Sequence, residues 1–210
     1  MQLLYFSFFG RLPSQTETAL QVNEALNRGV SRTALTTGFL NSTEFNTGGR
    51  FIAGLYAGIL DRDAEFSGWL FQRNALSMGS VNPTSLIGNF MGSQEYALKF
   101  GNPSNEDFVR LLYRYVLLRE AALAEVQFHA GFLASGSTRV QLATNFLNSQ
   151  EFRGCSGPRL TAFLLHACLL LRDATAPEFA LRSEQIRAGR PVIDIITEIL
   201  ASQEFLGLIN

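Results

Sequence analysis

Lysine, cysteine, histidine and tryptophan are scarce in this 210-residue sequence. It has 2 cysteines, 2 histidines and 1 tryptophan, and Lys99 is the only lysine among 17 basic residues. Cys155 and Cys168 form no CxxC motif and have no histidine at ligand spacing, which excludes the common zinc and dithiol redox motifs. We expect two unpaired thiols, with a Cys155–Cys168 disulfide as the alternative. High genomic GC content would explain the arginine excess. The alternative is a need for the planar, bidentate guanidinium.

Neither a strong net charge nor a long hydrophobic run is present. The net charge is −1 and the isoelectric point is about 6.1, so nothing electrostatic predicts binding to nucleic acid or an anionic membrane. The opening "MQLLYFSFFGR" lacks the basic region and cleavage site of a signal peptide. The longest apolar run, residues 160–171, has 12 residues, whereas a bilayer span needs about 20. We therefore expect a buried helix there and no membrane insertion.

Motifs that carry known chemistry are also missing. The sequence has no nucleophile elbow, phosphate-binding loop, HExxH motif, EF-hand loop or Rossmann glycine pattern. His166 and His129 lie 37 residues apart, and nothing in the sequence places them together. We predict no catalytic, metal-binding or cofactor-binding residue, no cofactor, and a protein that is not an enzyme.

A tetrad of the form Ser-x-Glu-aromatic occurs four times. The sequence reads "NSTEF" at 41–45, "GSQEY" at 92–96, "NSQEF" at 148–152 and "ASQEF" at 201–205. An arginine stands 32 or 33 residues before each tetrad glutamate, and a glycine stands 17 or 18 residues after each arginine. Six residues before the arginine comes Tyr5, Tyr56, Tyr113 or His166. Four landmarks that keep their spacing indicate a tandem repeat of about fifty residues.

The repeat predicts an all-α fold. Each copy is expected to contain three short helices, giving about twelve, because apolar residues recur at helical spacing and no sustained period of two appears. The middle helix should stop at the landmark glycine as a left-handed C-cap. Short joints between copies, "NTGGR", "FGNPSN" and "GCSGP", predict that neighbouring copies pack into one compact or solenoid-like unit. The predicted copies are residues 1–49, with a truncated first helix, 50–101, 102–156 and 157–210.

Four arginine–glutamate pairs are the predicted structural landmarks. We expect each repeat arginine to contact a tetrad glutamate of its own or a neighbouring copy, because a guanidinium and a carboxylate fix the angle between helices well. The alternative is a row of four carboxylates that binds a cation, which we disfavour because each glutamate has a matching arginine. The residues are Arg11, Glu44, Arg62, Glu95, Arg119, Glu151, Arg172 and Glu204.

With these residues in view, the sequence resembles a bacterial family known as domain of unknown function four-two-one-four. The stretches that carry the resemblance are "LLYFSFFGRLP", "LYAGILDRDAEFSGW", "LLYRYVLLRE" and "GSTRVQLATNFLNSQEF". Gly68 and Trp69 match the family's glycine and aromatic, whereas the other copies lack the tryptophan. The resemblance implies a secreted or cell-surface protein, and similar helical domains anchor surface layers to polysaccharide. A weaker likeness is to phycobilisome linker domains.

Two functions follow from this resemblance. The first is a non-enzymatic interaction or assembly module at the cell surface, whose partners are other segments of a larger surface protein or copies of itself. The alternative is a glycan-binding anchor, with Trp69, Phe71 and Arg73 as the candidate sugar contacts; exposure of Trp69 would favour it. A phycobilisome-linker-like scaffold ranks third.

Both ends of the sequence are apolar. It opens with "MQLLYFSFF" and closes with "FLGLIN", whereas terminal units of stacked repeats normally carry polar caps. Three explanations are open: the chain is cut from a longer surface protein, its ends are covered in a head-to-tail array, or it is a monomer whose ends fold onto its own core.

Overall fold

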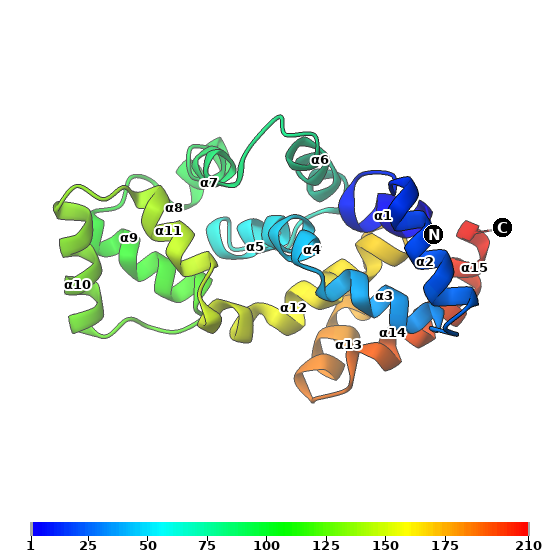
Figure 1. Ribbon diagram of the computed structural model, residues 1–210. Helices are drawn as coiled ribbons and strands as arrows, with labels where there is room; N and C mark the ends of the chain where they lie inside the picture. The colour runs from blue at the N-terminus through cyan, green and yellow to red at the C-terminus, as the bar shows by residue number, and fades with distance from the viewer. Residues whose placement is uncertain (1, 210) are drawn as a thin grey trace. The chain divides into compact units, whose positions relative to one another are not determined.

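The computed structural model describes residues 2–209, and every regular element in that range is helical (Figure 1). The described range holds fifteen α-helices and one π-helical turn, and no strand occurs between residues 2 and 209. The predicted all-α class is confirmed. Within the same range, no helix combines the length and hydropathy that a membrane crossing requires.

The chain divides into two compact units. Within the described range, unit 1 comprises residues 2–52, 65–78 and 158–209, and unit 2 comprises residues 53–64 and 79–157. The divisions fall inside helices α5 (Gly49–Ile59) and α12 (Gln150–Leu169). Unit 1 therefore combines copies 1 and 4 with the middle helix of copy 2, and unit 2 holds copy 3 with most of the rest of copy 2.

The remaining elements belong to one unit each. Those of unit 1 are α1 (Gln2–Phe9), α2 (Gln15–Leu26), α3 (Arg32–Asn41), α4 (Thr43–Thr47), α6 (Phe66–Ser77), α13 (Ala176–Arg187), α14 (Val192–Ala201) and α15 (Gln203–Ile209). Those of unit 2 are α7 (Pro83–Met91), α8 (Gln94–Phe100), α9 (Asn105–Leu111), the π turn (Leu112–Val116), α10 (Leu123–Ala134) and α11 (Arg139–Leu147).

The last helices of the copies pack in pairs. In unit 2, α7 of copy 2 packs on α11 of copy 3. In unit 1, α3 of copy 1 packs on α14 of copy 4, where Thr197 Oγ1 lies 3.4 Å from Thr33 Oγ1 (Figure 1). Copies 1 and 4 stand at opposite ends of the sequence, and a linear solenoid would keep such copies apart because each repeat contacts only its neighbours. Unit 1 is thus compact and not solenoid-like.

The tetrad begins a separate short helix, which corrects the expectation of three helices per copy. Ser42 donates its hydroxyl to the Phe39 carbonyl at the end of α3 and accepts the Phe45 amide at the start of α4. Ser93 and Ser202 make the same two bonds, and Ser149 accepts the amide of Phe152. One serine thus satisfies orphan backbone groups at two helix ends, and α4, α8, the start of α12 and α15 are a fourth helix of their copies.

One predicted turn is wrong. The "GCSGP" joint, residues 154–158, lies inside α12, which runs on through Pro158. In unit 2 the segment before the proline is held by burial of Phe152 and Ser156, and the Ser156 hydroxyl donates to the Phe152 carbonyl at 2.5 Å. Side-chain packing therefore keeps the chain helical where glycine and proline predict a turn.

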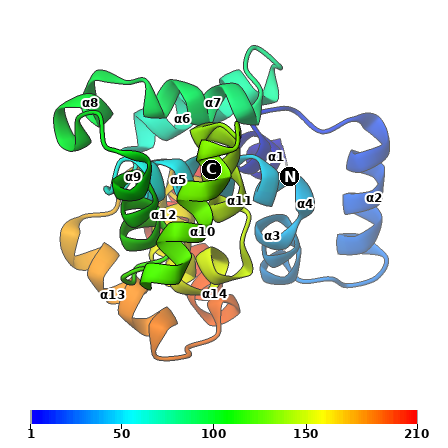
Figure 2. The same ribbon diagram turned by 90° about the vertical axis from the view of Figure 1, so that its left-hand side faces the viewer.

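Other local expectations are confirmed. The landmark glycines that follow the middle helices, Gly29, Gly79, Gly136 and Gly189, all have positive φ. The apolar run predicted to form a buried helix is buried throughout residues 160–170. The last helices bury large apolar residues in every copy, such as Phe39, Phe90, Phe146 and Ile199. Helix α2 differs from this pattern because none of its side chains is buried, and Figure 2 shows it displaced to the side of α3 and α4.

Candidate functional site

The structure places every repeat arginine against the tetrad glutamate of its own copy. The Nε atom of each arginine donates to one carboxylate oxygen, and the distances are 2.7, 2.5, 2.6 and 2.5 Å in copies 1 to 4. The joined residues are Arg11 with Glu44, Arg62 with Glu95, Arg119 with Glu151, and Arg172 with Glu204. Each bond ties the end of the first helix to the fourth helix of the same copy.

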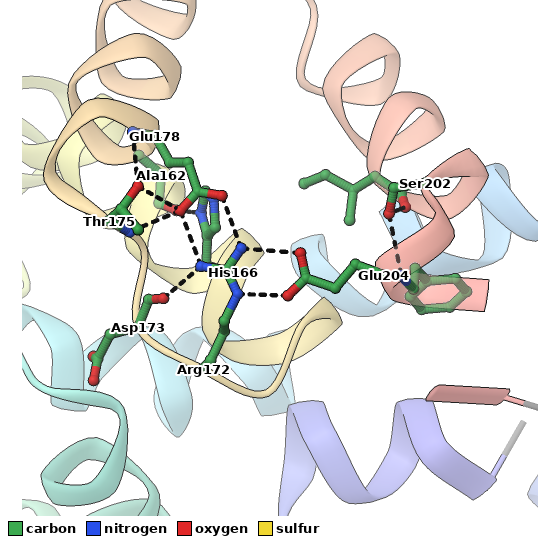
Figure 3. A network of polar contacts seen from close by, with 10 residues as sticks. Ala162, His166, Arg172, Asp173, Thr175, Glu178, Ser202 and Glu204 are labelled. Carbon is green, nitrogen blue, oxygen red and sulfur yellow. Dashed lines mark hydrogen bonds and ion pairs between the residues drawn. The ribbon is translucent and has the colours of Figure 1, made fainter. Parts of the chain in front are cut away.

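Arg11, Arg119 and Arg172 each bind a second glutamate as well, which the sequence reasoning missed. Arg172 holds Glu178 through two bonds of 2.7 and 2.9 Å, and Figure 3 shows its guanidinium between Glu178 and Glu204. Arg11 and Arg119 hold Glu17 and Glu125 at the same distances. A detectable signal was present, because glutamate stands six residues after these three arginines, whereas copy 2 has Gly68 there.

The second glutamate also caps the middle helix. Glu17 accepts the backbone N–H of Ser14 at 2.8 Å, and Glu125 and Glu178 accept those of Ala122 and Thr175 in the same way. A carboxylate at this position completes a capping box and interacts favourably with the helix dipole. The arginine therefore fixes the N-terminus of the middle helix relative to the first and fourth helices.

These contacts set the electrostatics of each cluster. Hydrogen bonds from Arg11 hold the pKa of Glu17 at about 2, and those from Arg119 hold the pKa of Glu125 at about 2. The bonds from Arg172 lower the pKa of Glu178 further, and the carboxylates raise the pKa of all three arginines. Groups that stay ionised across the neutral range do not exchange protons there, so this arrangement suits a structural clamp better than acid–base chemistry.

An aromatic ring and a preceding residue with left-handed backbone conformation position each repeat arginine. The guanidinium carbons of Arg62 and Arg119 lie 4.8 and 4.6 Å from the ring centroids of Tyr56 and Tyr113, within cation–π range. The residue immediately before the arginine has positive φ in all four copies: Gly10 at 75°, Asp61 at 50°, Leu118 at 56° and Leu171 at 55°. Three of these four are not glycine, and such strain persists where surrounding contacts over-determine the backbone.

The two histidines are packing residues in this structure. His166, which replaces the repeat tyrosine, is buried, and its Nδ1 lies 3.0 Å from the carbonyl oxygen of Ala162. His129 contacts the rings of Tyr113 and Phe146, and burial lowers its pKa. Cys155 and Cys168 are free thiols. Across residues 2–209, no group of three histidine, cysteine, aspartate or glutamate side chains is arranged to hold a metal ion.

Two of the three candidate glycan contacts are buried in the structure. Trp69 and Arg73 are 0% and 2% exposed, whereas Phe71 is 69% exposed on the opposite side of α6. Trp69 donates its indole N–H to the Gly49 carbonyl at 2.8 Å and meets the ring of Phe163 edge-on. The residues that cover this tryptophan stand 20 and 94 positions away in the sequence, which is why helical spacing alone did not reveal its burial.

Arg73 is part of the core of unit 1. Its guanidinium stacks at 4.9 Å on the Trp69 ring and donates to the Ser7 carbonyl and to Asn74 Oδ1. Burial lowers the pKa of Arg73 and of Arg50, and it raises the pKa of Cys168 to about 12. Cys168 is therefore a neutral, inert thiol.

The middle helices share an exposed apolar position. The ninth residue after the repeat arginine is a large apolar side chain in every copy, and it is between 54% and 72% exposed. The four residues are Leu20, Phe71, Phe128 and Leu181. Single exposed apolar residues are ordinary, but recurrence at one repeat position in all four copies marks a candidate interaction surface.

One family comparison bears on the chain. The model of a family described as Domain of unknown function (DUF4214) matches residues 87–155, from the last helix of copy 2 to just beyond the tetrad of copy 3. This segment is a DUF4214 domain. The predicted resemblance is thereby confirmed for these residues, and the domain includes the whole Arg119 cluster. No curated protein and no solved structure matches the chain, and the likeness to phycobilisome linkers has no support from these comparisons.

Proposed function

We propose that this chain is a non-enzymatic interaction or assembly module of a bacterial secreted or cell-surface protein. One observation carries the proposal: α2 is a twelve-residue helix without a buried side chain, and it exposes Leu20, Val22 and Leu26. Isolated helices of this length are marginal in water, and most helical stability in proteins comes from packing an apolar face. A helix that keeps its apolar side chains in solvent is suited to packing against a partner.

The arginine clusters support this interpretation. Arg11 fixes the N-terminus of α2 through Glu17 and anchors itself on Glu44, so the helix is held at one end while its outer face stays open. In the four clusters the arginine and glutamate side chains are bonded to one another, and each middle helix exposes an apolar side chain beyond its cluster: Leu20, Phe71, Phe128 or Leu181. The assignment to the bacterial cell surface rests on the family resemblance, and the family description supplies no activity.

The glycan-binding alternative receives less support. Sugar sites use exposed aromatic faces with nearby hydrogen-bonding groups, and here Trp69 and Arg73 are both covered by unit 1. Of the three, Phe71 alone remains accessible, and a single phenyl ring gives little specificity. We therefore favour a protein partner over a polysaccharide.

Site-specific photo-cross-linking in the producing bacterium tests the proposal. A photoreactive amino acid replaces Leu20 in one variant and Leu98 in the control, because Leu98 is an exposed leucine on α8, outside the middle helices. We expect an identified protein to cross-link from position 20 and not from position 98. The purified partner should then bind the chain, and Leu20→Glu should weaken that binding by at least about tenfold. Equal cross-linking from both positions, or none, would contradict the proposal.

A further inference from the structure

We infer that the outer face of α10 is a homotypic docking surface, on which α10 of a second molecule of this chain packs antiparallel. The inference rests on the proposed assembly function and names its partner and geometry. The face, called the α10 face below, consists of Ala124, Gln127, Phe128, Gly131, Phe132 and Ser135, and all six residues are exposed. It lies entirely within unit 2, where α10 packs on α9 and α11 (Figure 1).

The chemistry of the α10 face specifies an uncharged partner. Glu125 is the only Asp, Glu, Lys or Arg residue in the helix, and Arg119 already binds it at 2.7 Å. The exposed residues include two phenylalanines one helical turn apart, with Phe128 72% exposed. The middle helix of copy 4, α13, differs because it carries the exposed charged residues Glu184 and Arg187. A partner that offers charged groups would leave them desolvated and unpaired on this surface.

The order of residues makes the face complementary to itself. Residues 124, 128, 131 and 135 follow the alternating four- and three-residue steps of a coiled-coil seam. A two-fold axis beside the helix, midway between residues 128 and 131, places Phe128 of each molecule opposite Gly131 of the other. The same axis places Ala124 opposite Ser135, whereas Gln127 and Phe132 flank the seam on opposite sides and each lies beside its own counterpart. Within the seam the large side chain of Phe128 thus faces a residue without a side chain, as a self-complementary, isologous interface requires.

Two α10 helices packed in parallel would not be complementary in this way. Parallel packing would set Phe128 against Phe128 and Gly131 against Gly131, which leaves one layer crowded and the next empty. Gly131 is exposed, and a Cβ added there meets no atom within 4 Å, so the surface above this residue is open in the single molecule. Only copy 3 has glycine at this position: the equivalent residues elsewhere are Asn23, Asn74 and Glu184. The seat for an aromatic side chain is therefore specific to α10.

The expected interaction is weak in isolation. One face of a twelve-residue helix buries less than the roughly 1,200 Å² below which complexes are transient. We expect a monomer–dimer equilibrium with a dissociation constant on the order of 10–100 μM for the full chain. In a surface array, many such contacts would act together and raise the avidity.

Sedimentation equilibrium of the full chain and three variants tests the inference. Phe128→Glu should weaken dimerisation by at least about tenfold. Gly131→Leu should do the same by filling the seat, while its melting temperature equals or exceeds that of the parent because leucine suits a helix interior better than glycine. Leu98→Glu removes an equally exposed apolar residue outside the face and should leave the dimer unchanged.

The orientation has its own readout. One variant carries Ala124→Cys and a second carries Ser135→Cys. When the two are mixed, disulfides between the different variants should outnumber those between two copies of the same variant, because the antiparallel axis brings residues 124 and 135 together. A parent chain that stays monomeric in the millimolar range, or a Gly131→Leu chain that dimerises like the parent, overturns the inference. Neither result affects the cross-linking from Leu20, so failure here is distinguishable from failure of the proposed function.

Discussion

Helices α2 and α6 occupy the same place in copies 1 and 2, and both belong to unit 1, but they are held by different forces. Helix α6 buries Trp69 and Arg73, and its first residue donates its amide to Asp173 Oδ1 at 2.5 Å. Helix α2 has Thr18 and Val22 at the equivalent positions, has no fully buried residue, and is bonded at its N-terminus through Arg11 and Glu17. The comparison shows that the middle helix of a copy is held to unit 1 by side-chain packing in copy 2 and by ion pairs in copy 1.

The energetic scales of these attachments differ. Burying a tryptophan removes a large apolar area from water, whereas a half-exposed ion pair contributes a modest amount because water screens it. We therefore expect α6 to unfold only with unit 1, and α2 to open locally at a lower free energy. Four experiments sharpen or break this comparison, beginning with the largest expected effect.

Trp69→Ala should destabilise the protein by about 3–5 kcal/mol, the range for truncating a large buried aromatic. The equivalent change in α2, Thr18→Ala, should cost less than about 0.5 kcal/mol because Thr18 is exposed. Urea unfolding followed by circular dichroism measures both. Similar losses for the two variants would show that α2 is packed as firmly as α6.

Gly49→Ala should cost about 1–3 kcal/mol through overpacking. A Cβ at Gly49 would lie 2.7 Å from Phe45 Cε2 and 2.9 Å from Trp69 Cζ2, so the rings that hold α6 would have to shift. Gly38→Ala in α3 is the matched control, because nothing lies within 4 Å of its added Cβ. That variant should be neutral or slightly more stable, and thermal melts distinguish the two.

Glu17→Gln should cost about 0.5–1.5 kcal/mol, since the charge-assisted bonds to Arg11 are lost at a half-exposed site. The loss should be local. Hydrogen exchange should accelerate in the amides of α2 and stay unchanged in α6. Glu24→Gln, which removes only the surface pair with Arg28, serves as the control. Faster exchange in both helices would contradict independent attachment.

The smallest expected effect is the change with pH in the stability that Glu17→Gln removes. The pKa of Glu17 is lowered to about 2 from an ordinary 4.5, so its stabilisation is fully present above pH 4.5. The stabilisation disappears as the pH falls through this window toward 2. The difference in melting temperature between the parent and Glu17→Gln should therefore shrink across that range. A difference that is constant down to pH 2 would show that the carboxylate charge does not hold α2.

Much of the fold and part of the site could be predicted from local sequence. The spacing from Arg11 to Glu44 recurs in every copy, so the pairing followed from the repeat without any knowledge of the fold. The role of Glu17 was equally predictable from local sequence, because Ser14 and Glu17 form a recognisable capping box. The tetrad serine likewise indicates a helix start, and the expected count of three helices per copy was wrong because each tetrad opens a further helix.

The sequence by itself determined the all-α class, the landmark glycines that follow the middle helices and the arginine–glutamate pairs, because these depend on residues within one copy and on backbone chemistry. Only the tertiary structure decided that copy 1 packs on copy 4, that α12 continues through Pro158, and that Trp69 is covered by Gly49 and Phe163. Those outcomes depend on which distant surfaces meet. Burial is a property of the surrounding chain and not of the residue, so α2 and α6, with the same place in the repeat, came to present different faces to solvent.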